Sequence, residues 1–225
     1  MEDCKKMRKY DAVIFDMDGI IFDSERATLA CWISLEKKYG ICDMEKNFLA
    51  CIGTTKDRTR EIMLEAYGDE FPYDLYAKEA SKMFHDKYDG GRLPMKKGVT
   101  NILDYLKKNH KKIALASSTR LKTVIEQLRE AHILTYFDEV IAGDMVAKSK
   151  PEPDIFLLAC KKIGVDPDNA YAVEDSYNGI KAAYAGGLKA VMVPDLLPAD
   201  DEMIKLAEIV VNDLDCVVDY LSKFK

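Results

Sequence analysis

The chain has few of the residues that build zinc fingers, disulfide scaffolds or membrane spans. Among its 225 residues are three histidines and six cysteines, and no two cysteines form a C-x-x-C pair, which excludes the common zinc-finger and thioredoxin-like motifs. No stretch approaches the roughly 18 apolar residues that a membrane helix needs. We therefore expect a protein of the reducing cytoplasm, with unpaired cysteine thiols and no membrane partner.

A surplus of positive charge is also lacking. The 33 lysine and arginine residues are outnumbered by 39 acidic residues, which gives a net charge of -6. Since nucleic-acid-binding surfaces are usually basic, we expect no nucleic-acid partner. The charged first ten residues do not resemble a signal peptide. Neither a repeat nor a coiled-coil pattern is present, so a monomer is the expected state.

Four short apolar runs predict strands of a parallel sheet, because runs that are apolar on both faces suit strands covered by helices. The runs are 12–15, 113–116, 170–173 and 190–193. Helical patterns lie between the later runs, at 121–131, 154–163 and 179–185. This alternation predicts an α/β fold with a Rossmann-like parallel-sheet core.

The interval between the first two strands predicts helices only, because its apolar residues recur at helical spacing. The expected helices are 24–39, 44–51, 55–67 and 74–88, and the core resumes with a helix at 99–108. We interpret residues 23–91 as an inserted all-helical domain and residues 1–22 and 92–225 as the core domain. Two glycines in Asp89-Gly90-Gly91 predict the outgoing hinge.

Polar side chains follow the expected strands, at the edge where open parallel sheets bind ligands. Three segments follow strands directly: Asp16-Met17-Asp18-Gly19, Ser117-Ser118-Thr119 and Glu174-Asp175-Ser176. A fourth, Lys148-Ser149-Lys150-Pro151, comes a short way before the strand 170–173. A carboxylate can attack phosphorus, and a second acid can move the proton. Clustered carboxylates suit Mg²⁺, while lysine and hydroxyl groups suit phosphoryl oxygens. These segments therefore indicate phosphoryl transfer.

The same segments, in this order, resemble the four motifs of the haloacid dehalogenase superfamily, in its branch with a helical cap. The resemblance covers nearly the whole chain. It implies that Asp16 is the nucleophile and Asp18 the general acid/base. Ser117 would bind phosphoryl oxygens, and Lys150 would hold Asp16 and the phosphate together. The implied Mg²⁺ ligands are Asp16, the backbone carbonyl of Asp18, and Asp175, with Glu174 adjacent.

Each of these residues also has an ordinary structural interpretation. Asp16 and Asp18 suit a turn, Ser117 suits a helix N-cap, and Lys150 suits a surface loop. Two acids directly after a buried strand repel each other unless a cation lies nearby, however. We favour the functional interpretation because all four motifs are present and in order.

The substrate would be chosen by the inserted domain and by the second strand end. The candidate contacts are Ser24, Thr28, Trp32, Gly53, Thr54, Thr55 and Lys56 in the inserted domain, and Ser118, Thr119 and Arg120 in the core. The chain is similar to β-phosphoglucomutase and its phosphatase relatives, with two departures. Thr28 stands where the mutase has a histidine, and Lys56 where it has an arginine. Lysine lacks the bidentate fork of arginine, and threonine cannot replace imidazole in proton transfer.

These departures favour a magnesium-dependent phosphatase that acts on a small phosphorylated metabolite such as a sugar or polyol phosphate. A β-phosphoglucomutase-type phosphomutase is the alternative, because the four core motifs serve both reactions. A third interpretation is a phosphometabolite-binding protein that kept the fold without catalysis, since a fold alone does not fix a function. Because all four chemical motifs are intact, we favour either enzyme over the binding protein.

Overall fold

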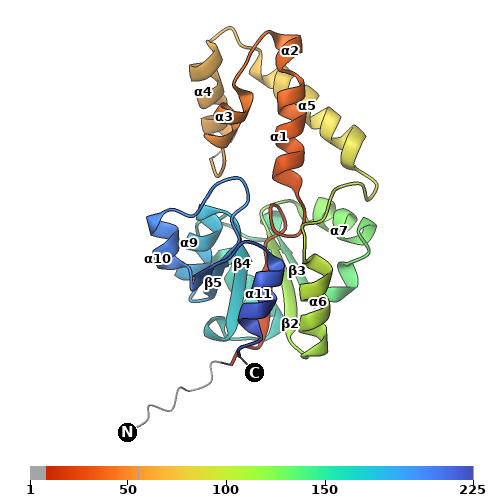
Figure 1. Ribbon diagram of the computed structural model, residues 1–225, viewed down its shortest axis with the longest axis vertical. Helices are drawn as coiled ribbons and strands as arrows, with labels where there is room; N and C mark the ends of the chain where they lie inside the picture. The colour runs from red at the N-terminus through yellow and green to blue at the C-terminus, as the bar shows by residue number, and fades with distance from the viewer. Residues whose placement is uncertain (1–8, 55, 225) are drawn as a thin grey trace. The chain divides into compact units, whose positions relative to one another are not determined.

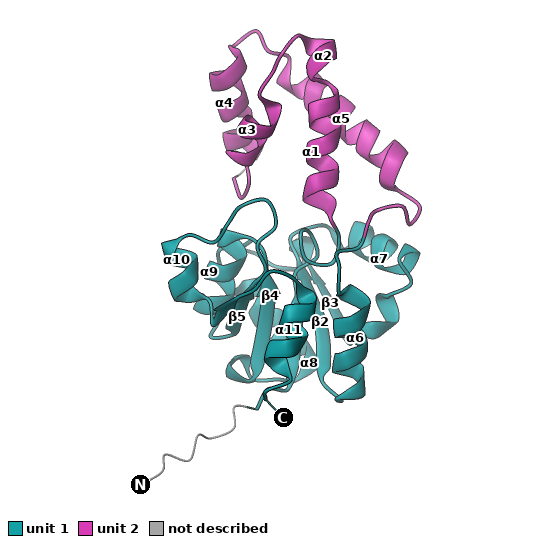
Figure 2. Cartoon of the chain, in the orientation of Figure 1, with its two compact units in different colours: residues 1–22, 95–225 teal, residues 23–94 magenta. Residues whose placement is uncertain are grey.

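A computed structural model describes residues 9–54 and 56–224, and the chain divides into two compact units (Figure 2). Unit 1 comprises Met1–Phe22 and Met95–Lys225, and unit 2 comprises Asp23–Pro94. Within the described ranges, no helix is both long and apolar enough to cross a membrane.

Unit 1 is built on a six-stranded sheet in which every neighbouring pair is parallel. Its strands are β1 (Ala12–Phe15), β2 (Lys112–Ser117), β3 (Glu139–Ala142), β4 (Ala170–Glu174), β5 (Lys189–Met192) and β6 (Ile209–Val210). The strand order is β3-β2-β1-β4-β5-β6. The first strand in sequence is therefore central, with β2 and β4 on its two sides, which explains why its residues are apolar on both faces.

Helices cover both faces of this sheet (Figure 1). They are α6 (Val99–Lys108), α7 (Leu121–Glu130), α8 (Asp154–Ile163), α9 (Tyr177–Ala185), α10 (Asp201–Leu206) and α11 (Leu214–Leu221). Phe156 of α8 and Ile180 of α9 belong to one core cluster with Ile14 and Ala172 of the sheet. Helices α6 and α11 pack together and cover the opposite face. The two layers bury the strands and leave the carboxyl ends of the strands to carry polar groups.

Three helices of unit 1 begin with a side-chain cap that the sequence supplies. Ser176 accepts a hydrogen bond from the N–H of Gly179 at the start of α9. Asp200 caps α10, and Asp213 caps α11. Each cap satisfies a backbone N–H that has no partner within its helix, so it fixes where the helix begins.

Unit 2 contains helices and no strand among its described residues, and it has its own aromatic core. Its helices are α1 (Ser24–Ser34), α2 (Glu36–Tyr39), α3 (Met44–Leu49), α4 (Lys56–Tyr67) and α5 (Tyr73–Tyr88). Trp32 of α1 packs against Phe48, Tyr73 and Tyr76. The hydroxyl of Tyr76 also donates to the backbone carbonyl of Trp32 at 2.5 Å. These contacts join α1, α3 and α5 around a single core.

The predicted α/β core with an inserted helical domain is confirmed, and three elements differ from the expectation. The predicted helix 24–39 is two helices that meet at Leu35. The hydroxyl of Ser34 donates to the carbonyl of Cys31 at 2.7 Å, and such bonds compete with the helical ladder. Strands β3 and β6 were not expected, because β3 begins with a charged residue and β6 has two residues.

Candidate functional site

The turn after β1 brings Asp16 against the neighbouring strand. The backbone N–H of Asp16 donates to the carbonyl of Val173 in β4 at 3.0 Å. Gly19, with φ +77°, closes the turn by donating its N–H to the carbonyl of Phe22 at 2.9 Å. A Cβ on Gly19 would lie 2.3 Å from an oxygen of Asp175. Glycine is therefore required both by the backbone conformation and by the close approach of Asp175.

Lys150 joins two of the candidate acids. Its ammonium group lies 2.5 Å from Asp16 Oδ1 and 2.6 Å from Glu174 Oε1. It also donates to the carbonyl of Ala116 at 3.0 Å. An ammonium group has three donors, and these contacts use all three. The three charged side chains are at most 9% exposed, so Lys150 is held in one place rather than lying on a surface loop.

Glu174 is held by the helix that follows it. Its Oε2 accepts hydrogen bonds from the N–H of Asp175, the N–H of Ser176 and the hydroxyl of Ser176, at 2.9 to 3.0 Å. A Cβ on Gly179 would lie only 1.8 Å from the carboxyl carbon of Glu174. Ser176 and Gly179 thus form a cradle for this carboxylate at the first turn of α9, where the helix dipole favours negative charge.

The electrostatics of the site call for additional positive charge. Burial raises the pKa of Asp16 well above its usual value, and the negative charges of Glu174 and Asp18 raise it further against the opposing effect of Lys150. Burial alone would lower the pKa of Lys150, but Asp16 and Glu174 more than offset this and raise it. One ammonium therefore does not balance this group of buried acids.

A divalent cation fits this donor set. One carboxylate oxygen from each of Asp16, Glu174 and Asp175 lies within 4.8 Å of the others, and all three residues are buried. The donors are oxygens, which Mg²⁺ prefers over nitrogen or sulfur. This cluster can hold a metal ion.

Asp18 is positioned by the end of β2. The hydroxyl of Thr119 donates to Asp18 Oδ2 at 2.9 Å. Ser117 is fully buried and its hydroxyl accepts the N–H of Thr119 at 3.1 Å. The structure thus brings Asp16, Asp18, Ser117 and Lys150 to one edge of the sheet with Glu174 and Asp175. Ser118 and Arg120 are exposed at the same strand end.

The other predicted contacts lie in unit 2, where the structure assigns several of them local roles. Ser24 begins α1, Thr28 is partly buried within α1, and Trp32 is a core side chain. Thr54 follows Gly53, and its hydroxyl donates to the carbonyl of Cys51 at 2.7 Å. Lys56 is the exposed first residue of α4, and Thr55 lies outside the described residues. Substrate contacts from these residues stay a prediction.

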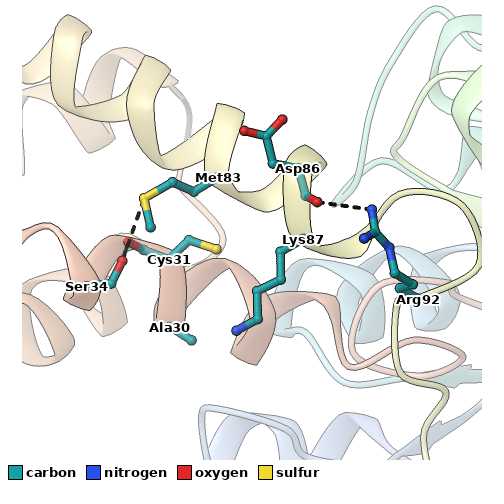
Figure 3. A pocket seen from close by; sticks show the side chains of 7 residues that line it. All are labelled: Ala30, Cys31, Ser34, Met83, Asp86, Lys87 and Arg92. Atoms are coloured by element: carbon teal, nitrogen blue, oxygen red, sulfur yellow. Dashed lines mark hydrogen bonds between the residues drawn. The ribbon is translucent and has the colours of Figure 1, made fainter.

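Unit 2 also carries a surface depression of about 520 Å³ between α1 and α5 (Figure 3). Arg92 donates to the carbonyl of Asp86 at 3.0 Å, and the hydroxyl of Ser34 lies 3.7 Å from the sulfur of Met83. These contacts are local to unit 2. None of the predicted site residues lines the depression, so we assign it no part in the reaction.

Sequence reasoning missed Gly179 and the link between Thr119 and Asp18. Gly179 follows Ser176 at the spacing of an N-cap and its third helical residue, so a glycine there could have been recognised as a close-approach position. Thr119 was assigned to substrate, whereas its hydroxyl contacts Asp18. No sequence signal identifies that contact, because it joins residues 101 positions apart.

The chain is similar to known hydrolases and to a phosphomutase. Residues 13–193 match the model of the haloacid dehalogenase-like hydrolases. A phosphorylated carbohydrates phosphatase of Thermotoga maritima is 30% identical over 185 residues, 80% of this chain and 83% of the relative. The β-phosphoglucomutase of Bacillus subtilis is 32% identical over 193 residues, 81% and 82% of the two chains. A putative β-phosphoglucomutase structure from T. maritima, 26% identical, superposes with a TM-score of 0.78 over 95% of this chain and 99% of that one.

Proposed function

Because the chain belongs to the haloacid dehalogenase-like hydrolase family, we propose that it is a magnesium-dependent phosphatase of a small sugar or polyol phosphate. The observation that carries this proposal is the buried group of Asp16, Glu174 and Asp175 around Lys150. A nucleophilic carboxylate beside a fixed ammonium group and further acids is what phosphoryl transfer through an acyl phosphate requires.

In the first half-reaction, a carboxylate oxygen of Asp16 attacks phosphorus and the bond from phosphorus to the sugar oxygen breaks. Asp18 gives its proton to that leaving oxygen, so the alcohol departs neutral. Thr119 orients Asp18 through its hydroxyl hydrogen bond. Lys150 holds Asp16 in place and contributes positive charge next to the transferring group.

In the second half-reaction, Asp18 accepts a proton from water while the water oxygen attacks phosphorus. The bond between phosphorus and Asp16 breaks, which restores the carboxylate and releases inorganic phosphate. Ser117, buried at the end of β2, is the donor we assign to the phosphoryl oxygens. Mg²⁺, when bound by Asp16, the Asp18 carbonyl and Asp175, would offset negative charge on the phosphoryl group.

The leaving group is the part of the substrate that this family branch selects with its cap. We propose that the helical domain, expected at residues 23–91, is this cap. Thr28 and Lys56 support hydrolysis over mutase chemistry, because a mutase must grip the second phosphate of its intermediate while the first is transferred. Lysine gives a point charge there but no bidentate contact.

A phosphomutase is the second candidate, because the B. subtilis relative named β-phosphoglucomutase is 32% identical to this chain. The two reactions share the aspartyl-phosphate and differ in its fate. Water accepts the phosphoryl group in a phosphatase, whereas a sugar hydroxyl accepts it in a mutase. Product analysis therefore separates them.

The test is inorganic phosphate release from a panel of sugar, polyol and nucleotide phosphates, with Mg²⁺ and with chelator. Glucose 6-phosphate formation from β-glucose 1-phosphate is followed in parallel. Asp16→Asn should abolish release, since an amide is a far weaker nucleophile. Asp168→Asn is the matched control, because Asp168 is an exposed acid in the turn before β4.

Magnesium-dependent release that Asp16→Asn abolishes and Asp168→Asn retains is the expected result. Formation of glucose 6-phosphate with little phosphate release would replace the phosphatase by the mutase. Tight binding of one compound with no turnover of any would overturn both enzymes in favour of a binding protein.

A further inference from the structure

A separate ion pair lies at the same edge of the sheet as the candidate metal cluster. Lys96 Nζ lies 2.6 Å from Asp195 Oδ1, and the side chain of Asp195 has no exposed surface. Asp195 follows β5, which neighbours the strand that ends at Glu174. The N–H of Val193 donates to the carbonyl of Glu174 at 2.8 Å and holds the two strand ends together.

This arrangement brings a further acid close to a predicted metal ligand. A carboxylate oxygen of Asp195 lies within 4.8 Å of one of Asp175. Two carboxylates at this separation repel each other, and burial strengthens the repulsion. Lys96 compensates for the charge of Asp195. The Lys96–Asp195 pair therefore lies beside a predicted metal ligand, Asp175, and adds no net charge there.

Lys96 is also fixed through its backbone. Its N–H donates to the carbonyl of Ile21 at 2.9 Å, and the N–H of Ile21 donates to the carbonyl of Met17 at 2.8 Å. Met17 lies between Asp16 and Asp18 in sequence. Lys96 thus connects the turn that carries both catalytic acids to Asp195 beyond β5. An anchored backbone reduces the freedom of the lysine side chain to leave its partner.

We infer that Lys96 and Asp195 are a positioning pair for the metal centre, in which the carboxylate of Asp195 accepts a hydrogen bond from a water on the bound Mg²⁺. Mg²⁺ usually keeps several of its waters in protein sites. Groups that bind such outer ligands tune metal affinity by about 10–100-fold. This inference rests on the proposed magnesium-dependent function and adds two residues to its site.

Two variants separate positioning from simple charge. Asp195→Asn removes one negative charge near the site, and Lys96→Met removes one positive charge. If only net charge acts, the first variant weakens Mg²⁺ binding and the second strengthens it. If Lys96 positions Asp195, both variants weaken binding. The double variant is then little worse than either single one, because the two residues act as a unit.

The experiment is isothermal titration of the full chain with MgCl₂ in phosphate-free buffer, supported by the thermal shift that Mg²⁺ produces. We expect the dissociation constant to rise about 10-fold in both single variants. Lys96→Arg, which keeps the charge, should restore most of the affinity. Glu202→Gln is the matched control, since Glu202 forms an exposed pair with Lys181 at 2.9 Å.

Unchanged affinity in Asp195→Asn, or tighter binding in Lys96→Met, would overturn the positioning pair while leaving the proposed function intact. A parent protein that binds no Mg²⁺ would overturn the metal-dependent function as well. Circular dichroism without metal identifies a variant that fails to fold. Should Asp195→Asn do so, the contrast between Lys96→Met and Lys96→Arg decides the question, with equal affinities refuting the pair.

Discussion

Replacing Lys150 with methionine tests whether this residue balances the buried acids. Methionine is also long and flexible, so the change chiefly removes the ammonium charge and its hydrogen bonds to Asp16, Glu174 and Ala116. Asp16 and Glu174 would remain buried beside each other without a cation. The metal-free protein is the state to measure, because Mg²⁺ would partly replace the lost charge.

The distances set an upper bound on the loss of stability. Unit charges 2.5 Å apart attract by about 7 kcal/mol at an effective dielectric constant of about 20, and Lys150 makes two such contacts. The cost of taking the ammonium out of water cancels several kcal/mol of this gain. Removal of one partner from a buried ion pair typically destabilises by about 3–5 kcal/mol, because a charge is left uncompensated. We expect a loss in that range for Lys150→Met.

Urea unfolding at pH 7, followed by circular dichroism with chelator present, measures this loss. For a protein of this size it corresponds to a fall in melting temperature of roughly 6–20 °C. Lys181→Met is the control, because the Lys181–Glu202 pair is exposed and should contribute less than about 1 kcal/mol. A loss below about 1 kcal/mol in Lys150→Met would refute the view that Lys150 stabilises the acids of the site.

Two further predictions concern helix starts in unit 1. Gly179→Ala should lower the free energy of unfolding by about 1–3 kcal/mol in urea, because the new Cβ would clash with the carboxyl group of Glu174. A rise of about 1 kcal/mol, which helix propensity alone predicts, would contradict this. Asp213→Ala should cost about 1 kcal/mol at pH 7. Hydrogen bonds from the Cys216 N–H and from Lys97 lower the pKa of Asp213 to about 2. The ionised carboxylate therefore stabilises the fold above its ordinary pKa near 3.8. This stabilisation is lost as pH falls toward 2. The difference between parent and variant should shrink over that window, and one that stays constant down to pH 2 would exclude a charged cap.

The core of the fold could be predicted because its signals are local. β1 is an uninterrupted apolar run that ends at an acid, and α6 and α8 have the bounds that their apolar spacing predicts. β3 gave no such signal, because Glu139 and Val140 are only half buried at the edge of the sheet. Edge strands depend on pairing with a neighbour rather than on a continuous apolar pattern.

The candidate site was predictable as a set of motifs but not as a network. Strand-end placement was enough to group Asp16, Ser117 and Glu174, because parallel strands end at the same edge. Lys150 lies in the loop before α8 and was grouped with them through the order of the motifs. Side-chain geometry decides which atoms each group contacts. The hydrogen bonds from Lys150 to Ala116 and from Thr119 to Asp18 join residues far apart in sequence. The cradle around Glu174 is local, but it depends on how its carboxylate is oriented. Residue propensities and motif spacing do not predict such side-chain contacts.

The central position of β1 has a consequence for how the chain folds as it is synthesised. β1 is synthesised before the other strands of the sheet, but its two neighbours begin only at Lys112 and Ala170. At about 5–20 residues per second, an apolar strand with both edges unpaired waits roughly 5–20 s for β2. Unit 2, whose contacts are local in sequence, can complete its helices during that delay. While β1 is unpaired, its open edges can pair with other chains, so it is a site of aggregation in the nascent chain. The cluster of Asp16, Glu174 and Asp175 can assemble only after β4 has been made.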